Sequence, residues 1–151
     1  MALEISGGED LPSQTRKSLE ELTDRILEEF GRPDEDVSLR LTDSKEIRKL
    51  NRRFRGLDKP TNVLAFTLDE EEDGFLGEVI LCLEKAKEEA GQARMSFPER
   101  LHELLAHGLL HLLGFDHESD REHGWENSER RVRGILRRCI RENSGCKDSR
   151  S

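Results

Sequence analysis

Apolar side chains recur along the chain at the two spacings that distinguish helices from strands. In residues 13–30 they fall three or four positions apart, which predicts a helix capped by Ser13 and ended by Gly31. Apolar and polar residues alternate over 37–41, as in a half-buried strand, and a short strand is also expected at residues 3–6. The first part of the chain therefore predicts a helix between two strands.

A second helix should follow this strand. Asp43 is expected to cap it, because Glu46 stands three residues later as in a capping box, and Gly56 should end it. Three apolar residues of this helix are expected to face inward: Ile47, Leu50 and Phe54.

The second half of the chain predicts a hairpin followed by helices. Residues 62–68 and 75–83 are rich in β-forming side chains and flank the acidic stretch DEEED, so they should pair as strands joined by a long loop. Helices are expected over 84–94, over 98–113 and from Asp120 onward. With about four strands and about five helices, the sequence predicts an α+β fold with helices packed on a small mixed sheet.

Length and composition limit the chain to one domain. Its 151 residues suffice for a single core, so we expect one domain over residues 1–151 with frayed ends at 1–12 and 143–151. The net charge of −8 does not indicate a general nucleic-acid binder. Residues 45–59 nevertheless hold seven basic side chains against two acidic ones. This local patch allows phosphate binding, although a solvated helix face explains it equally well.

The expected location of the protein rests on sequence patterns that are absent from the chain. No segment resembles a membrane span or a signal peptide, which predicts a cytoplasmic protein with no membrane partner. No pair of cysteines has the CxxC spacing, which fits a reducing compartment and argues against a thiolate zinc site. Cys82 and Cys139 fall at apolar-periodic positions and should be structural. Because the chain has no long apolar surface helix, a monomer is expected.

Three of the five histidines lie within the stretch HGLLHLLGFDH. His107 and His111 are four residues apart in a predicted helix, so both imidazoles share one face and can reach a single ion. Gly114 permits the turn that ends the helix, after which His117 can supply a third nitrogen. Three protein ligands leave a fourth position for water, which predicts a catalytic divalent metal, with Zn²⁺ as the expected ion. Ordinary histidines on a partly buried helix are the alternative.

The residues around these histidines leave several roles open. The spacing H-x-x-x-H-x-x-G-x-x-H is also that of metzincin proteases, which need a glutamate where this chain has Gly108, so a metzincin-like metallopeptidase is the second hypothesis. Glu103 is either a base or ligand-orienting group, or a surface acid. Asp116 either orients a ligand or belongs to the turn. The other two histidines are expected to be structural or at the surface: His102 and His123.

Together with the histidine motif, the stretch NRRFRGLDKPTNVLAF makes the chain resemble the YbeY family of bacterial metal-dependent endoribonucleases. The family motif H-G-x-x-H-L-x-G-x-D-H is matched by residues 107–117. A second block, an asparagine, an aromatic-Arg-Gly and a Pro-Thr-(Asp/Asn)-Val-Leu run, is matched within 51–66. A third, a Gly-acid-hydrophobic strand, is met by Gly77 and Glu78. Three residues depart from those the family commonly has: Phe54 for tyrosine, Ala65 for serine and Glu78 for aspartate.

The resemblance implies a hydrolase that prefers single-stranded RNA and acts in ribosomal RNA maturation and ribosome quality control. It implies a zinc-like ion on His107, His111 and His117, and it carries over Arg55 as a functional residue near the metal. In the expected mechanism, metal-activated hydroxide or the RNA's own 2′-hydroxyl attacks a phosphodiester while Arg55 stabilises the charge that develops. The implied partners are single-stranded or ribosomal RNA and ribosome-associated proteins.

Two further expectations concern the surroundings of the site. Five basic residues could form a phosphate track beside it, or a solvated surface: Arg48, Lys49, Arg52, Arg53 and Lys59. The acidic stretch 69–73 should point away, since it would repel RNA.

A third hypothesis for the function is a non-catalytic ribosome-associated factor whose metal only stabilises the fold.

Overall fold

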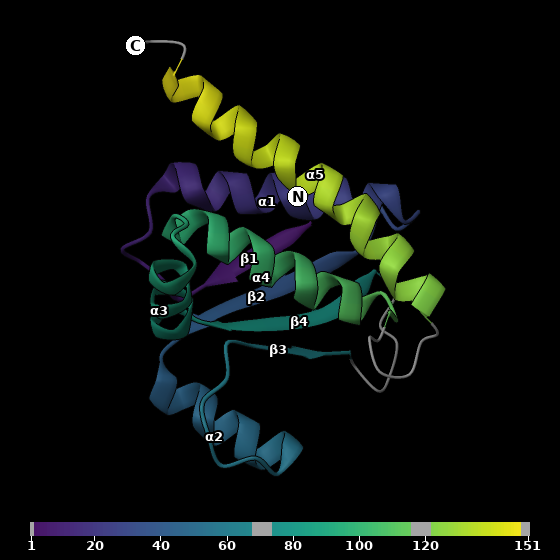
Figure 1. Cartoon of the computed structure of the whole chain (residues 1–151). Coiled ribbons are helices and arrows are strands. Elements are labelled where there is room, and N and C mark those ends of the chain that lie inside the picture. Colours follow the sequence, from purple (N-terminus) through teal and green to yellow (C-terminus); the bar gives the residue numbers. More distant parts are fainter. Residues whose placement is uncertain (1, 68–73, 116–121, 149–151) are drawn as a thin grey trace.

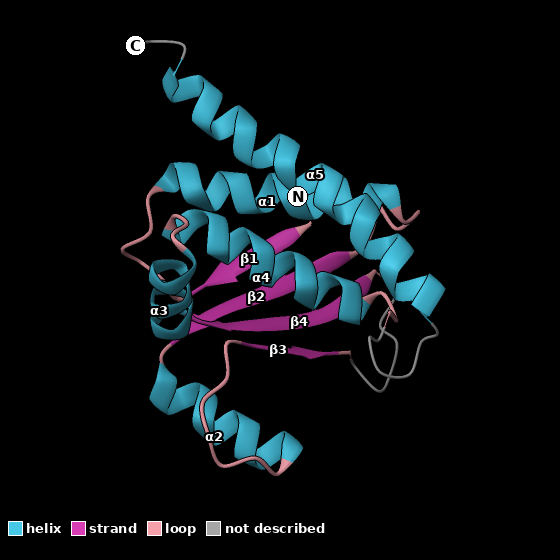
Figure 2. Cartoon of the chain, in the orientation of Figure 1, coloured by secondary structure: helices cyan, strands magenta, loops and turns pink. Residues whose placement is uncertain are grey.

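The centre of the computed structural model is a mixed sheet (Figure 2). Residues 2–67, 74–115 and 122–148 are described, the side chains of 122–125 and 143–148 excepted, and within them the sheet has four strands in the order β1-β2-β4-β3. The first three in this order are parallel to one another, whereas β3 runs antiparallel to β4, which confirms the predicted hairpin. The strand bounds are Leu3–Ser6 (β1), Asp36–Thr42 (β2), Val63–Phe66 (β3) and Phe75–Cys82 (β4).

Helices cover both faces of this sheet (Figure 1). Helices α1, α4 and α5 lie on one face, α2 lies on the other, and α3 packs beside α4. The predicted α+β class with five helices is therefore confirmed for the described part of the chain. The helix bounds are Ser13–Glu29 (α1), Ser44–Arg55 (α2), Leu83–Ala93 (α3), Phe97–Leu112 (α4) and Glu122–Asp148 (α5).

The side chains of β4 explain why helices are needed on both faces. Successive residues of a strand point to opposite sides, and Val79 and Leu81 enter the main core beneath α1 and α4. Ile80 and Cys82 enter a smaller cluster, which α2 closes with Ile47. Each large side chain buried in this way stabilises the fold by roughly 1.5–3 kcal/mol. The position of α2 therefore follows from a strand that is apolar on both sides.

Both ends of α2 have the predicted caps. The Asp43 carboxylate accepts a hydrogen bond from the Glu46 N–H at 2.8 Å, and Gly56 takes a left-handed conformation with φ +73° at the other end. The Ser96 hydroxyl and the Glu99 side chain form a reciprocal capping box at the start of α4. At α1 the prediction was wrong by one position: Pro12 occupies the cap without a side-chain bond, and Ser13 is already helical.

The prediction that Phe54 faces inward was also wrong. Ile47 is fully buried and Leu50 partly, whereas the Phe54 side chain is 56% exposed. The cluster beneath α2 is small and is filled by Ile47 and Leu50. Phe54 stands one helical turn beyond Leu50, where its ring meets the ring of Phe66 at the end of the edge strand. Its exposure follows from the position of the helix end beyond this cluster.

Several other expectations can be compared with the structure. The short strand expected at residues 3–6 is present as β1 and pairs with β2, although it lies in the segment that the sequence predicts to fray. Cys82 and Cys139 are buried and free, as expected for structural cysteines. No helix among the described residues is long and apolar enough to cross a membrane. The acidic stretch 69–73, whose direction the sequence predicts, lies outside the described residues.

His102 is a structural histidine inside the main core. Its Nδ1 lies 2.6 Å from the Pro98 carbonyl oxygen, which can only accept a hydrogen bond, so Nδ1 carries the proton. Its Nε2 lies 2.6 Å from the Ser18 hydroxyl, which therefore donates. Burial lowers the pKa of His102 below its usual range, although the Pro98 contact and nearby Glu99 act in the opposite direction. The native fold thus favours the neutral form of this imidazole.

We expect His102 to make the protein less stable in acid. Below about pH 6.5 the unfolded chain binds a proton at this histidine that the native state resists, so the free energy of unfolding should fall as the pH drops. Urea unfolding of the wild type and of His102→Gln between pH 7.5 and about 5 should give a shallower pH dependence for the variant. Two parallel curves would contradict this assignment.

Candidate functional site

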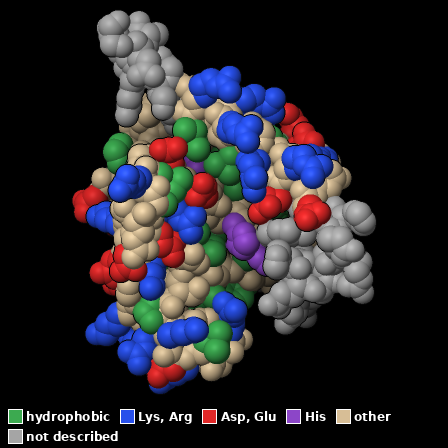
Figure 3. Space-filling view, viewed as in Figure 1, with side chains coloured by type: hydrophobic (Ala, Val, Ile, Leu, Met, Phe, Trp, Pro, Cys, Tyr) green, Lys and Arg blue, Asp and Glu red, His purple; other side chains and the backbone are tan. Residues whose placement is uncertain are grey.

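A cleft opens where the end of α4 meets the edge strand β3. Its volume is about 800 Å³. In the space-filling view, histidine side chains are visible at the surface, in a hollow of the molecule (Figure 3). This histidine cleft is lined by Arg55, Thr61, Asn62, Val63, Leu64, Ala65, Phe66, Thr67, His107, Gly108, His111, Leu112 and Glu129. Arg55, His107 and His111, which the sequence singled out, therefore line one cavity.

His107 and His111 direct the same ring atom to one point. Their Nε2 atoms lie 3.1 Å apart, and the ring centroids are 4.7 Å apart with the planes edge to face. A tetrahedral zinc ion with Zn–N distances of about 2.0–2.1 Å would place two nitrogen ligands about 3.3 Å apart. The spacing predicted from the helical period thus produces a pair of nitrogens that fits two positions around one ion.

The third predicted ligand, His117, lies outside the described residues, as does Asp116. Gly114, after which the chain was expected to turn, has φ +96° and follows the end of α4. No group of three or more histidine, cysteine or acidic side chains suited to a metal occurs among the described residues. Of the three predicted metal ligands, the described residues therefore contain two, the histidine nitrogens on α4. The side chain of His123 is likewise not described.

Gly108 has a packing role that bears on the peptidase hypothesis. A Cβ atom at this position would lie 2.7 Å from Val79 Cγ1 and 3.0 Å from Val79 Cγ2. Such distances are too short for carbon atoms in contact, so α4 can approach β4 only because residue 108 has no side chain. A glutamate could occupy this position only if Val79 or α4 shifted. The cleft therefore lacks the base that a metzincin places beside its first histidine.

Arg55 reaches the cleft from the opposite face of the sheet. It is the last residue of α2 and is exposed, and Gly56 then turns the chain back toward β3. The buried Asn51 side chain fixes this return, because its amide donates to the Lys59 carbonyl oxygen at 2.9 Å. A guanidinium group held at the rim of a cleft can bind two oxygens of a phosphate at once.

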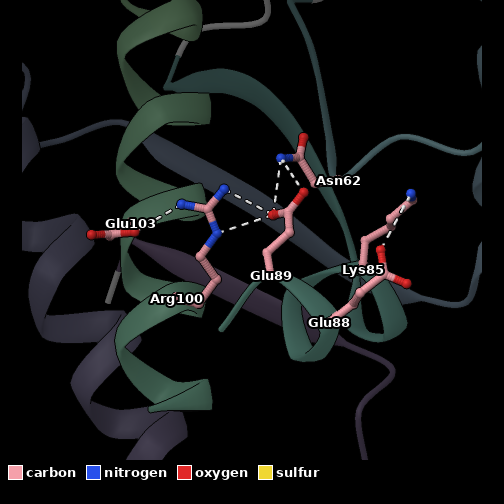
Figure 4. A network of polar contacts seen from close by, with 6 residues as sticks. All are labelled: Asn62, Lys85, Glu88, Glu89, Arg100 and Glu103. Atoms are coloured by element: carbon pink, nitrogen blue, oxygen red, sulfur yellow. Dashed lines mark hydrogen bonds and ion pairs between the residues drawn. The ribbon is translucent and has the colours of Figure 1, made fainter. Parts of the chain in front are cut away.

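A second cavity of about 620 Å³ adjoins the histidine cleft and shares four of its residues. On one side of it the Glu89 carboxylate accepts from Arg100 at 2.8 Å and from the Asn62 amide at 3.2 Å (Figure 4). Arg100 also donates to Glu103 at 2.8 Å. Glu103 is thus a partly exposed acid with an arginine partner, and it lines this second cavity together with His107.

Glu129 is the residue that the sequence analysis missed. It is half-buried on α5 and lines both cavities together with His107. Its carboxylate also lies 3.3 Å from the Arg133 guanidinium, four residues along the same helix. That spacing is typical of an ordinary surface pair, so the sequence offered no signal for it. Its negative charge makes the histidine cleft better suited to a cation.

Three comparisons with known proteins agree. A family model described as endoribonuclease YbeY matches residues 6–138. The endoribonuclease YbeY of Sulfurihydrogenibium sp. (strain YO3AOP1) is 42% identical over 111 residues, which cover 72% of this chain and 73% of that protein. The endoribonuclease YbeY of Syntrophotalea carbinolica is 40% identical over 131 residues, with 83% and 87% covered. The solution structure of TM1509 from Thermotoga maritima is similar with a TM-score of 0.63, 31% identity, and 98% and 93% covered.

Proposed function

The chain belongs to the YbeY endoribonuclease family, and on this basis we propose that it is a metal-dependent endoribonuclease that prefers single-stranded RNA. We further propose that it acts in the cytoplasm as a monomer, in ribosomal RNA maturation and ribosome quality control, together with ribosome-associated proteins. One observation carries the assignment of the site. The two Nε2 atoms of α4 lie 3.1 Å apart in the cleft that Arg55 also lines.

The proposed metal site consists of His107, His111 and His117, and Zn²⁺ is the proposed ion. A bound divalent ion would act as a Lewis acid that lowers the pKa of water toward neutrality. His107 and His111 would hold the ion with the nitrogens that already converge. Glu129, which also lines this cleft, adds negative charge to it.

The chain's own residues would bind and orient the phosphodiester. Arg55 presents two parallel N–H groups to the oxygens of a phosphate at the rim, where negative charge develops during the attack. The attacking group is either water or the 2′-hydroxyl of the RNA itself. The products distinguish these two reactions, because attack by the 2′-hydroxyl leaves a 2′,3′-cyclic phosphate, whereas attack by water does not.

We expect the purified protein to cleave single-stranded RNA at least about tenfold faster than the same sequence in a duplex, because unpaired bases and a flexible backbone can adapt to the cleft whereas a rigid duplex cannot. An unstructured protein substrate should remain intact, because Gly108 leaves no base beside His107. Gel electrophoresis of end-labelled RNA and of the protein substrate measures both. Cleavage of the protein substrate would favour the metallopeptidase. A metal-loaded protein that cleaves neither substrate would favour the non-catalytic ribosome-associated factor.

A further inference from the structure

The exposed ring of Phe54 has no function in the core. Among the described residues, only Phe54 and Leu57 are large hydrophobic side chains with exposed positions, 56% and 39% respectively. Phe54 precedes Arg55, the last residue of α2, and Leu57 follows the helix end two positions after Arg55. An exposed apolar side chain is common on protein surfaces and is no evidence of a site by itself. The arrangement around this ring supplies the evidence.

Two neighbours hold the Phe54 ring in place. The Phe66 ring lies 5.1 Å away between centroids, at an interplanar angle of 55°. The Arg53 guanidinium carbon lies 5.4 Å from the Phe54 centroid, a cation–π distance. Phe66 itself lines the histidine cleft. The Phe54 ring is therefore an oriented aromatic surface beside that cleft, part of which remains open to solvent.

The charge around this ring suits a polyanion. Lys and Arg side chains gather over α2 in the space-filling view (Figure 3). One of them, Arg48, is neutralised by Asp58 at 2.8 Å. The remaining basic residues of α2 and the turn after it are Lys45, Lys49, Arg52, Arg53, Arg55 and Lys59. An aromatic ring flanked by cations is the combination with which proteins bind unpaired bases and their phosphates.

We propose that Phe54, held by Phe66 and Arg53, stacks on one unpaired base of the RNA, while the basic residues of α2 contact the flanking phosphates. The proposal rests on the proposed function, because it assigns a binding position to the same class of substrate. It also gives a physical reason for the preference for single strands. A base can stack on a protein ring only if its own stacking and pairing in a duplex are absent.

Binding of two matched oligomers isolates the contribution of the ring. One is a 2′-O-methyl oligoadenylate of about twelve nucleotides, and the other has the same backbone without bases. Fluorescence anisotropy measures both affinities, and a gel verifies that the oligomers remain intact. Phe54→Ala should weaken binding of the oligoadenylate by about tenfold and change binding of the abasic oligomer by less than about twofold. Phe54→Trp should retain the affinity for the oligoadenylate.

Leu57→Ala is the matched control, because Leu57 is a second exposed apolar side chain beside the same basic surface but has no ring. It should leave both affinities unchanged. Equal losses for both oligomers in Phe54→Ala, or no loss, would overturn the stacking role, and so would a wild type that does not distinguish the two oligomers. Capture of a protein partner through Phe54, without any effect on RNA, would also overturn it.

The outcomes separate this proposal from the proposed function. A wild type that binds the oligoadenylate through Phe54 but cleaves no RNA would support the stacking position and contradict the endoribonuclease. A wild type that cleaves single-stranded RNA, with Phe54→Ala binding both oligomers normally, would contradict only the stacking position.

Discussion

We expect His111→Ala to lose the bound metal and at least about 10³-fold of its activity on single-stranded RNA, because the ion is proposed to supply the activated nucleophile. His111 contributes one of the two nitrogens that converge to 3.1 Å on α4. Without it, His107 cannot share an ion with a second donor from the same helix. The fold should persist, because the His111 side chain is only partly buried and contributes little to the core.

Metal content and cleavage should be measured on the same preparations. Protein purified without chelators is analysed by mass spectrometry for bound metals and then assayed on end-labelled single-stranded RNA. His123→Ala is the matched control, since the sequence predicts a surface position for that histidine. Circular dichroism verifies that each variant is folded.

Three outcomes have different consequences for the site. Loss of metal together with cleavage in His111→Ala alone supports the histidine pair as ligands of a catalytic ion. A His111→Ala protein that keeps its metal shows that the ligand assignment is wrong. A protein that loses its metal but still cleaves RNA shows that the ion is structural, which would favour the metal's role in stability over its role in catalysis.

Local features of this fold were predictable because they depend on neighbouring residues. The cap at Asp43, the left-handed end at Gly56 and the β3–β4 hairpin all follow from side chains a few positions apart. The strand order β1-β2-β4-β3 depends on pairing between distant segments, which no local pattern encodes. The exposure of Phe54 belongs to this second kind, since periodicity places it inward and only the limited extent of the cluster beneath α2 leaves it outside.

The residues of the site also differ in whether neighbouring residues in the sequence could predict them. The shared face of His107 and His111 follows from the helical period, so spacing alone predicts it. Arg55 reaches the same cleft as the last residue of α2, on the other face of the sheet, and the sequence indicates it only through the family resemblance. Glu129 comes from a helix that packs against α4, and nothing near it in the sequence distinguishes it from a surface acid.

Arg55→Ala is expected to lower kcat on single-stranded RNA by about 10²-fold and to leave the metal content unchanged, because a group that binds developing charge contributes mainly to the transition state. The residue lines the cleft from α2, whereas the two converging nitrogens come from α4. Arg55→Lys should recover only part of the activity, since an ammonium group keeps the charge but not the two parallel N–H donors.

Arg52→Ala is the matched control for this prediction, because Arg52 is an exposed arginine one turn earlier on the same helix and does not line the cleft. It should raise KM and reduce the salt dependence of binding by about 0.7 in the logarithmic slope, with kcat unchanged. If both variants behave alike, Arg55 is one more phosphate contact of the basic surface. If Arg55→Ala alone lowers kcat, its guanidinium acts on the reacting phosphate, and the cleft is the place of cleavage as well as of binding.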